Sequence, residues 1–370
     1  MMRKKAIGIL GYRGLVGNEA VNVLSKNDNY KLKLGSRRSQ KDIISKEKYE
    51  NISYHQIDIY DKHKLQSFCE DCDLIINCTG PSSKILSTVA EICIDKGVTY
   101  VNPSGDKAMI KKVETYQKTK PLCSTCIFSA GIYPGLTEIF IDYIAQKIFD
   151  EIKTIKLYLA GISSFSKNGS YDVISSLEND EGVGIAFCKK GNIKKITSGF
   201  GSKTLLPKPI GQVNVIPFIS DEFLRVVRHN KIEEAYFYNT FNNDEMMSQF
   251  VMIKASGQYK TETQKCASAE KLINVYNKNR NQNDCVMLHA VSTGRKEGTT
   301  MEIHSTLTCH KDWNKLSGTI AGIVADEILC KNKMERGSYF VHEIVSSKKV
   351  FERFLQQEGE IFHKEKALPF

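Results

Sequence analysis

The sequence predicts an α/β fold in which a Rossmann-type, doubly wound parallel sheet is joined to a second α+β domain with a mixed, largely antiparallel sheet. Three observations predict it. A glycine-rich segment, Gly8–Gly17, follows a short apolar stretch near the start of the chain. Apolar and amphipathic segments then alternate over about 150 residues, which is typical of a parallel sheet with helical crossovers. Beyond that region, segments resembling β-hairpins replace the alternation.

The elements of the first domain follow from hydrophobic periodicity. Residues 6–10 are a continuous apolar run and predict a buried strand, whereas residues 15–24 carry apolar side chains at helical spacing. Glycine, proline and polar residues mark the ends of the later elements, as Gly97 does for one helix. Further strands are expected within 30–38, 51–61, 73–81, 98–105 and 126–135. Further helices are expected within 61–68, 85–97 and 136–149, with another helical stretch before residue 126.

The second domain has a different pattern of residues, which predicts hairpins instead of alternating strands and helices. Turn-like sequences, among them residues 189–192 and 295–298, separate segments rich in β-branched and aromatic residues. We expect strands within 151–161, 183–198, 233–241 and 284–310, and helices at 220–228, 261–279, 316–329 and 348–357. The predicted organisation is a nucleotide-binding domain at 1–130, a substrate-binding and dimerisation domain at 131–310, and C-terminal helices at 311–370 that return to the first domain.

Charge and hydropathy narrow the class of protein. The net charge is +10, but the basic residues form only short clusters, so nucleic acid is not an expected partner. A modest basic excess suits an anionic small molecule or cofactor. The apolar run after Lys5 is interrupted at Tyr12-Arg13, too early for a signal peptide, and no segment approaches the roughly 18 apolar residues that a membrane span needs. We expect a cytoplasmic protein.

The number and placement of the cysteines also favour a cytoplasmic protein. The chain has 11 cysteines, an odd number scattered through apolar segments, which favours reduced thiols over a disulfide framework. Two Cys-x-x-Cys pairs, Cys69/Cys72 and Cys123/Cys126, resemble halves of a zinc site. About 50 residues separate them, which is far from the usual ribbon spacing, so no metal site is predicted.

The glycine-rich segment has the spacing of a phosphate-binding loop. Gly11, Gly14 and Gly17 follow a predicted strand and lead into a predicted helix, whose free N–H groups and positive dipole end suit a pyrophosphate. Leu15 and Val16 lie at the start of that helix. The alternative is a strand-to-helix turn that holds no ligand, since short motifs of this kind have false positives.

The end of the second strand predicts which nucleotide is bound. NAD-binding domains place an acidic residue there for the ribose 2′-hydroxyl, but this chain has Ser36, Arg37 and Arg38. A hydroxyl and a guanidinium group suit a 2′-phosphate, so NADP(H) is the predicted cofactor. Alternatively, both arginines are ordinary solvated charges. Asp58, after the third strand, either meets the adenine or caps a helix.

The fourth strand ends in a turn of small residues. Cys78, Thr79, Gly80 and Pro81 follow the apolar run 74–76 and Asn77. In a doubly wound sheet this turn would line the nicotinamide side of the ligand crevice. A plain strand terminator is an equal alternative.

Three segments together carry a family resemblance. "NCTGP", "AEICIDKGVTYVNPSGD" and "SAGIYPGLTEIF" resemble the saccharopine dehydrogenase-like NAD(P)-binding family, and the C-terminal segment from "LSGTIAGIVADEIL" to "FERFL" is similar to the family's returning helix. The likeness covers most of the first 140 residues and the last 60, by position in the sequence. Asn102 stands where the family more often has Asp, and Asp106 where Glu is common, so the resemblance does not extend to saccharopine as the substrate.

The resemblance implies a cofactor site and a reaction. It carries cofactor binding onto the glycine loop, onto Ser36 and Arg37, and onto the 78–81 turn. The implied reaction is reduction of an imine, the C=N bond formed from an amine and a carbonyl, in a small amino-acid-derived substrate. Hydride transfer would belong to the nicotinamide. Asp106 and Tyr133 are the candidate proton donors near the crevice, with Asp106 as a helix cap and Tyr133 as a packed aromatic side chain as their alternatives. Weaker candidates are Lys107, Tyr171 and His229.

Two other functions compete with imine reduction. Relatives of this family can reduce C=C bonds, so an enoyl reductase acting on a carrier-bound or lipid chain is one alternative. An NADPH-binding sensor or scaffold without turnover is the other, and it predicts tight cofactor binding without consumption. A homodimer is expected from the exposed sheet of the second domain.

Overall fold

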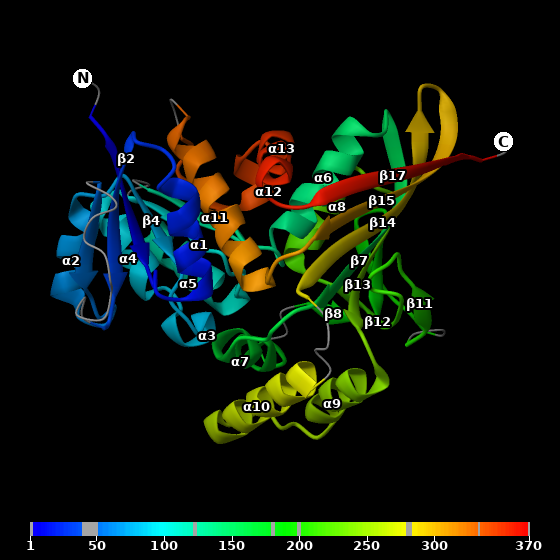
Figure 1. Ribbon diagram of the computed structural model, residues 1–370, viewed down its shortest axis with the longest axis horizontal. Coiled ribbons are helices and arrows are strands. Elements are labelled where there is room, and N and C mark those ends of the chain that lie inside the picture. The colour runs from blue at the N-terminus through cyan, green and yellow to red at the C-terminus, as the bar shows by residue number, and fades with distance from the viewer. Residues whose placement is uncertain are drawn as a thin grey trace. The chain divides into compact units, whose positions relative to one another are not determined.

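The computed structural model describes residues 3–38, 51–120, 124–178, 182–197, 201–278, 283–331 and 334–368. The chain divides into two compact units (Figure 1). Unit 1 is formed by Met1–Leu136 and Asn314–Val345, and unit 2 by Thr137–Trp313 and Ser346–Phe370.

Unit 1 contains a parallel sheet with strand order β16-β6-β5-β4-β1-β2-β3. This is the usual order of a doubly wound dinucleotide-binding sheet, extended at one edge by β16. The predicted Rossmann-type sheet is therefore confirmed. Its strands are β1 (Lys5–Leu10), β2 (Tyr30–Ser36), β3 (Ile52–Gln56), β4 (Leu74–Asn77), β5 (Thr99–Val101), β6 (Thr125–Phe128) and β16 (Gly337–Phe340).

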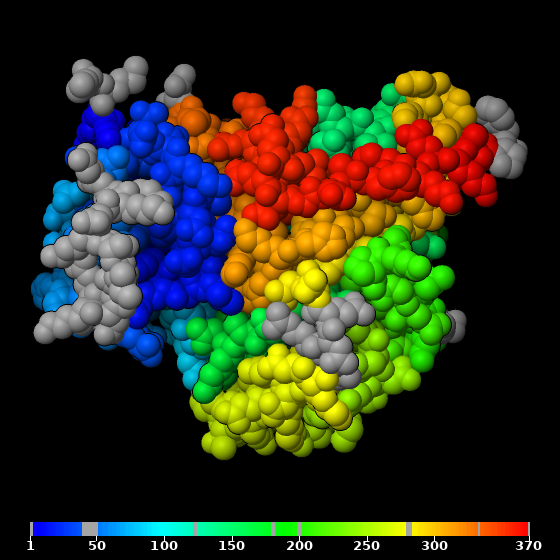
Figure 2. All heavy atoms as spheres, viewed as in Figure 1, coloured from blue at the N-terminus to red at the C-terminus, as the bar shows by residue number. Residues whose placement is uncertain are grey.

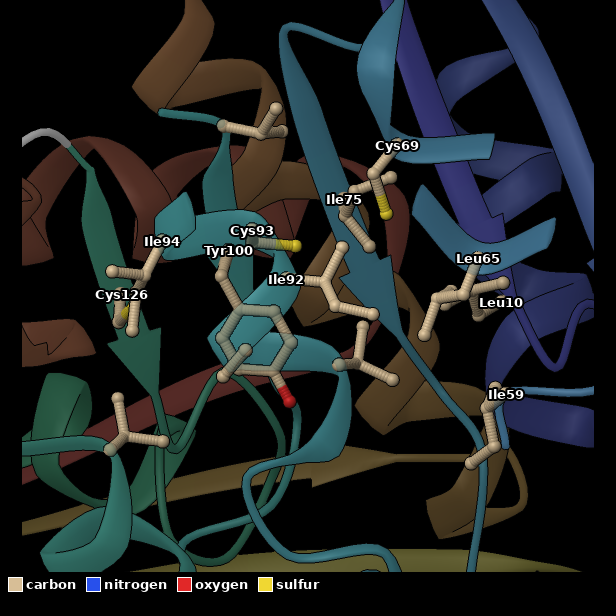
Figure 3. Close-up of a cluster of buried hydrophobic side chains, with 14 of the residues drawn as sticks. Leu10, Ile59, Leu65, Cys69, Ile75, Ile92, Cys93, Ile94, Tyr100 and Cys126 are labelled. Carbon is tan, nitrogen blue, oxygen red and sulfur yellow. The ribbon is translucent and has the colours of Figure 1, made fainter. Parts of the chain in front are cut away.

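Helices cover both faces of this sheet, which explains why its central strands are continuously apolar. All four residues of β4 are buried, for example. On one face α2, α4 and α5 pack into a core that includes Phe68, Cys93 and Tyr100 (Figure 3). The helices of unit 1 are α1 (Leu15–Leu24), α2 (Lys62–Glu70), α3 (Ser82–Ile85), α4 (Thr88–Lys96), α5 (Lys107–Lys118), α11 (Trp313–Leu329, all but its first residue) and α12 (Val341–Ile344).

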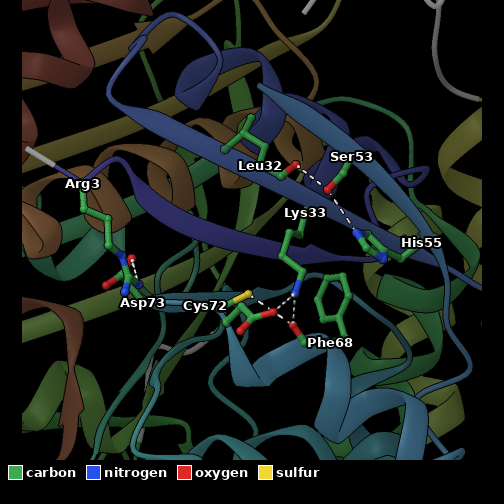
Figure 4. Close-up of polar contacts among 9 residues, drawn as sticks. Arg3, Leu32, Lys33, Ser53, His55, Phe68, Cys72 and Asp73 are labelled. Atoms are coloured by element: carbon green, nitrogen blue, oxygen red, sulfur yellow. Dashed lines mark hydrogen bonds and ion pairs between the residues drawn. The ribbon is translucent and has the colours of Figure 1, made fainter. Parts of the chain in front are cut away.

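Polar contacts hold α2 and the beginning of β4 against the neighbouring strands (Figure 4). The Lys33 ammonium donates to the Phe68 carbonyl at 2.8 Å and lies 5.2 Å from the centroid of the Phe68 ring. Asp73, just before β4, accepts the Ala6 N–H at 2.7 Å and pairs with Arg3 at 3.4 Å. The long aliphatic stem of Lys33 thus covers apolar surface while its charge is satisfied.

On the other face, α11 packs unusually closely on α1. A Cβ on Gly318 would lie 2.2 Å from the Val16 carbonyl oxygen, and one on Gly322 would lie 2.8 Å from the Val23 Cβ. Two glycines four residues apart therefore give α11 a flat stripe against α1. Because Val16 lies in the first turn of α1, directly after the glycine loop, α11 supports the loop from behind.

Unit 2 is built on a mixed sheet of ten strands. β13 and β7 pair in parallel and the other neighbours pair antiparallel, which confirms the expected mixed, largely antiparallel sheet. Its strands are β7 (Glu151–Ile162), β8 (Val183–Gly184), β9 (Ala186–Lys189), β10 (Asn192–Lys195), β11 (Lys203–Leu205), β12 (Gln212–Ile219), β13 (Glu234–Phe241), β14 (Cys285–Lys296), β15 (Thr299–Cys309) and β17 (Glu360–Ala367).

Three helices of unit 2 form a small cluster of their own. Tyr171 and Ile174 of α7 pack with Ile253 of α9 and with Ala269 and Leu272 of α10. The helices of this unit are α6 (Leu136–Lys147, all but its first residue), α7 (Lys167–Ser176), α8 (Asp221–His229), α9 (Asp244–Ala255), α10 (Glu262–Lys278) and α13 (Ser347–Gln357). We had not expected α3, α7, α9, α12, β11, β12, β16 or β17.

The end of the chain differs from the expected organisation. Asn314–Val345 joins unit 1, but Ser346–Phe370 belongs to unit 2 instead of returning to the nucleotide-binding domain. The reason is packing: Phe351 of α13 lies 5.4 Å, between ring centroids, from Phe140 of α6. β17 then pairs with β15 and runs along the surface, drawn in red in Figure 2.

Candidate functional site

The glycine loop joins β1 to α1 and turns at Gly11. Gly11 has φ +78°, a conformation that favours glycine. Its N–H donates to the Gly35 carbonyl at 2.9 Å, and its carbonyl accepts the Gly14 N–H at 3.0 Å. A Cβ on Gly11 would lie 2.7 Å from the Cys78 carbonyl oxygen. The structure thus brings the loop together with the ends of β2 and β4, at the carboxyl edge of the sheet.

Gly14 and Gly17 are glycines for different reasons. A Cβ on Gly17 would lie 2.5 Å from the Gly11 carbonyl oxygen, so the loop's own packing excludes a side chain there. A Cβ on Gly14 would meet the same oxygen at an ordinary 3.4 Å, and the φ of Gly14 is −78°. The protein itself therefore leaves room for a side chain at Gly14. This open position is what close approach of a pyrophosphate to the backbone requires.

The N-terminus of α1 suits an anion. In the described part of the chain no side chain caps this helix, and its first turn carries no acidic residue. Leu15 is 45 % exposed at the first helical position, and Val16 is partly exposed beside it. The N–H groups and the positive end of the helix dipole are thus not neutralised by the chain's own carboxylates. The loop residues fit the phosphates of a dinucleotide.

The residues after β2 lie next to this loop, because Gly35 contacts Gly11. Ser36 donates its hydroxyl to the Arg38 carbonyl at 3.0 Å, and the Gln56 amide donates to the Arg37 carbonyl at 3.1 Å. These bonds fix the backbone and leave the Arg37 and Arg38 side chains exposed. Both guanidinium groups are therefore available to a 2′-phosphate.

Asp58 is exposed after β3, and it is not the cap of α2. Its carboxylate accepts the Tyr60 N–H at 3.0 Å, while Asp61 caps the helix by accepting the Lys64 N–H at 3.1 Å. Two roles were expected for Asp58, contact with the adenine or a helix cap. The helix cap is Asp61, so Asp58 does not have that role.

The turn of Cys78, Thr79, Gly80 and Pro81 continues β4 at the same edge. All four residues are partly buried, and Asn77 before them is 2 % exposed. Burial raises the pKa of the Cys78 thiol to about 12, so this thiol stays protonated at neutral pH. The turn therefore offers shape and backbone groups, and no charge, to whatever lies against it.

The two candidate proton donors lie in unit 1, in loops that leave the sheet. The Asp106 carboxylate is 7 % exposed and accepts the Met109 N–H at 2.7 Å. Asp106 therefore caps α5, which is the alternative role expected for it. Tyr133 lies between β6 and α6 and is partly exposed. Lys107 is exposed in the first turn of α5.

The weaker candidates of unit 2 lie on helices. Tyr171 is buried in α7 and donates its hydroxyl to Glu262 at 2.8 Å, and His229 is exposed at the end of α8.

The described residues contain no group of three or more His, Cys, Asp or Glu side chains that could hold a metal ion. Cys69 and Cys72 lie buried in and after α2, and Cys126 is buried in β6. Cys123 lies outside the described residues. Among the helices that the structure describes, none is long and apolar enough to span a membrane.

Comparison with known families agrees with this geometry. Residues 7–124 match the family model described as the saccharopine dehydrogenase NADP binding domain. These residues, about a third of the chain, are a saccharopine dehydrogenase-like NADP-binding domain. The chain is therefore an NAD(P)H-dependent oxidoreductase with NADP(H) as its cofactor. The matched segment runs from β1 to the residues just before β6 and includes the glycine loop, the β2 end and the 78–81 turn.

Two solved structures resemble this chain over nearly its whole length. Saccharopine dehydrogenase (L-Glu forming) from Saccharomyces cerevisiae has a TM-score of 0.67 at 14% identity, covering 99% of this chain and 100% of that one. The DAP dehydrogenase of C. glutamicum, in complex with DAP, has a TM-score of 0.50 at 13% identity, covering 96% and 99%. At these identities the likeness is one of fold. No curated protein sequence matches the chain.

Sequence reasoning missed the side chains that support the 78–81 turn. In the sequence, Asn77 is the end of an apolar strand and Tyr100 lies within another apolar strand. In the structure, the Asn77 amide donates to the Tyr100 hydroxyl and its carbonyl oxygen accepts the Thr79 N–H. The signal in the sequence was a polar residue, Asn77, directly after three apolar ones.

Proposed function

We propose that the chain is an NADPH-dependent reductase of the C=N bond in a small amino-acid-derived metabolite. The observation that carries the proposal is the end-to-end likeness in fold to saccharopine dehydrogenase, with both chains covered almost completely. A second solved structure that matches over nearly its full length is a DAP dehydrogenase in complex with DAP. The first is an L-Glu-forming dehydrogenase, and a dehydrogenase that releases an amino acid from a secondary amine reduces an imine in the reverse direction.

The residues proposed to hold the cofactor lie along the carboxyl edge of the unit 1 sheet. They are Gly11, Gly14, Leu15, Val16, Gly17, Ser36, Arg37, Arg38, Asp58, Cys78, Thr79, Gly80 and Pro81. When bound, NADP(H) supplies the hydride. The chain's part is to bind the phosphates at α1, to select the 2′-phosphate at Arg37 and Arg38, and to orient the nicotinamide half at the 78–81 turn.

Proton delivery falls to Tyr133 or Asp106 in this proposal. The Asp106 carboxylate already accepts an N–H at the start of α5. Tyr133 is partly exposed in a loop without regular structure, so its hydroxyl is the better candidate for contact with a substrate. Tyr133→Phe should lower kcat more than it lowers the affinity for NADPH, whereas Asp106→Ala, which removes the cap of α5, should mainly lower the temperature of unfolding.

A homodimer in the cytoplasm remains part of the proposal. The cysteines that the structure describes are all free thiols, and most are buried, which suits a reducing compartment.

Light scattering at several protein concentrations would measure the mass of the particle in solution, and the mass of a monomer at all of them would contradict the dimer.

The reaction is tested with a panel of substrates in the presence of NADPH. Each assay pairs an amino acid with an oxo acid or aldehyde, and enoyl thioesters form a separate arm. Consumption of NADPH that requires both amine and carbonyl, with a new C–N bond found by mass spectrometry, supports the proposal. Consumption with enoyl thioesters alone would establish the C=C reductase instead. Tight binding with no consumption across the panel would favour a sensor.

A further inference from the structure

Two hydrogen-bonded branches meet at the hydroxyl of Tyr100 on β5. The side-chain amides of Asn77 and Asn102 both donate to the Tyr100 oxygen, at 3.0 Å and 2.7 Å. Tyr100 is fully buried and each asparagine is 2 % exposed. The two amides use both lone pairs of the phenol oxygen.

The first branch runs from Tyr100 to the beginning of the 78–81 turn. Asn77, the last residue of β4, accepts with its carbonyl oxygen both the N–H of Thr79, at 3.2 Å, and the Thr79 hydroxyl. The Cys78 N–H donates to the Leu10 carbonyl at 2.9 Å. This branch therefore sets the path of the Cys78–Thr79 peptide, which lies directly against Gly11.

The second branch runs from Tyr100 to the end of the same turn. The Asn102 carbonyl oxygen accepts the Ser104 N–H at 2.7 Å, and the hydroxyls of Ser104 and Ser82 are hydrogen-bonded at 2.9 Å. Ser82 is the first residue of α3 and follows Pro81. The Ser129 N–H also donates to the Ser104 carbonyl, at 3.0 Å, and fixes this branch to β6.

The two branches and the turn form a closed ring with Tyr100 at its far side. Figure 3 shows the Tyr100 side chain among Ile92, Cys93 and Ile94, with the hydroxyl oxygen at the tip of its aromatic ring. A phenylalanine would fill this apolar site equally well, and a buried hydroxyl is costly unless it is hydrogen-bonded. Packing alone thus does not explain a tyrosine here; the two amide donors do.

We propose that Tyr100 is a positioning residue, whose hydroxyl holds the 78–81 turn in the shape that binds the nicotinamide half of NADP(H). The turn follows β4, the first strand of the second mononucleotide-binding half of the sheet. The glycine loop and the arginines after β2 belong to the first half. Loss of the hydroxyl should therefore affect the nicotinamide half and spare the adenosine half. The inference rests on the proposed cofactor role of the turn.

The test compares two ligands on Tyr100→Phe by titration calorimetry. NADPH reports on the whole site, and adenosine 2′,5′-bisphosphate reports on the half that lacks nicotinamide. We expect Tyr100→Phe to weaken NADPH about tenfold, the size of one lost hydrogen bond, and to leave adenosine 2′,5′-bisphosphate within about twofold. This ratio does not depend on the substrate, and a general loss of stability would not change it.

Tyr30→Phe is the matched control. Tyr30 is another buried tyrosine of unit 1, and its hydroxyl donates to Asp326 on α11, away from the turn. We expect this variant to lower the temperature of unfolding and to keep the ratio of the two dissociation constants at the wild-type value. If Tyr100→Phe does not fold, Ser82→Ala removes the hydrogen bond that joins Ser104 to the end of the turn and should shift the ratio in the same direction.

Equal weakening of both ligands, or no weakening of NADPH, in the folded variant would overturn the inference. An unchanged ratio in Ser82→Ala would overturn it where Tyr100→Phe cannot be purified. Failure of the wild-type protein to bind NADPH is a different result, because it would contradict the cofactor role of the turn itself.

Discussion

At the scale of single residues, the three glycines of the loop do three different things. Gly11 turns the chain with a positive φ, Gly17 lets the loop pack on itself, and Gly14 is open on the protein's side. The sequence predicted the loop from spacing alone. It could not tell which glycine the fold needs and which one a ligand needs, because that depends on atoms from other segments.

Gly14→Ala tests this division of roles. The new methyl group would meet only ordinary contacts within the protein, so the temperature of unfolding should stay within about 2 °C of wild type. It would occupy the place of a close-approaching phosphate, so affinity for NADPH should fall at least about tenfold. Gly17→Ala is the comparison, since its methyl group would clash with backbone and should destabilise the fold. Unchanged affinity in Gly14→Ala would contradict the role of the loop.

Arg37→Asp tests the choice of nucleotide. The guanidinium group is exposed beside the glycine loop, where it can bind a 2′-phosphate, and the new carboxylate would repel that phosphate but accept a ribose hydroxyl. We expect NADPH to bind at least about tenfold more weakly, and NADH to bind equally well or better. Lys111→Asp on α5 changes the same charge at an exposed site elsewhere in unit 1 and should affect neither. Equal weakening of both nucleotides would count against selection by Arg37.

At the scale of elements, α11 supports the nucleotide site indirectly. Gly318→Ala would place a methyl group 2.2 Å from the Val16 carbonyl oxygen, so α1 and α11 would have to move apart. We expect a loss of about 1–3 kcal/mol in the free energy of unfolding, measured with urea, and weaker binding of NADPH. Gly184→Ala in β8 is the control, because the nearest atom to its new Cβ is a flexible lysine end at 3.9 Å. Wild-type stability in Gly318→Ala would refute the close packing.

The elements best predicted from sequence are those that local pattern defines. Residues 15–24 have helical apolar spacing, and the structure places α1 at those residues. β16 was missed because Gly337–Phe340 is short and pairs with β6 far away in sequence. β17 was missed because it is mostly exposed and charged, so that its pairing with β15 leaves no apolar alternation to detect. Such elements are specified by partners that the sequence does not identify.

At the scale of the whole molecule, stability should depend on pH through His289 of unit 2. Burial, with a smaller contribution from the neighbouring His304, lowers the pKa of His289 to about 4. An unfolded histidine has a pKa near 6.5, so between about pH 6.5 and pH 4 the unfolded chain binds a proton that the folded chain does not. The free energy of unfolding should therefore fall as the pH falls through this window.

His289→Gln isolates this contribution. Glutamine does not titrate and can still hydrogen-bond Thr306, the partner of His289 at 2.9 Å. The wild-type protein should lose about 2 kcal/mol more than the variant between pH 7 and pH 4, measured by urea unfolding at each pH. His229→Gln, at an exposed site, should behave like wild type. Parallel curves for wild type and His289→Gln would disprove the prediction.

The fold class and the cofactor could be predicted from the sequence, since alternation, the glycine spacing and the acid-free β2 end are local features. The path of the last residues could not, because α13 packs on α6 through aromatic contacts such as Phe140 with Phe351. Nor could the support of the 78–81 turn, which joins side chains of β4, β5, the loop after β5 and α3. The choice of substrate likewise depends on contacts between segments that are distant in the sequence, so it could not be predicted either.

The most direct test of the account is a titration of the wild-type protein with NADPH and with NADH under the same conditions. The glycine loop, the uncapped α1 and the two arginines after β2 predict that NADPH binds at least about tenfold more tightly than NADH. Equal or tighter binding of NADH would contradict the assignment of Ser36, Arg37 and Arg38, and binding of neither would contradict the site as a whole.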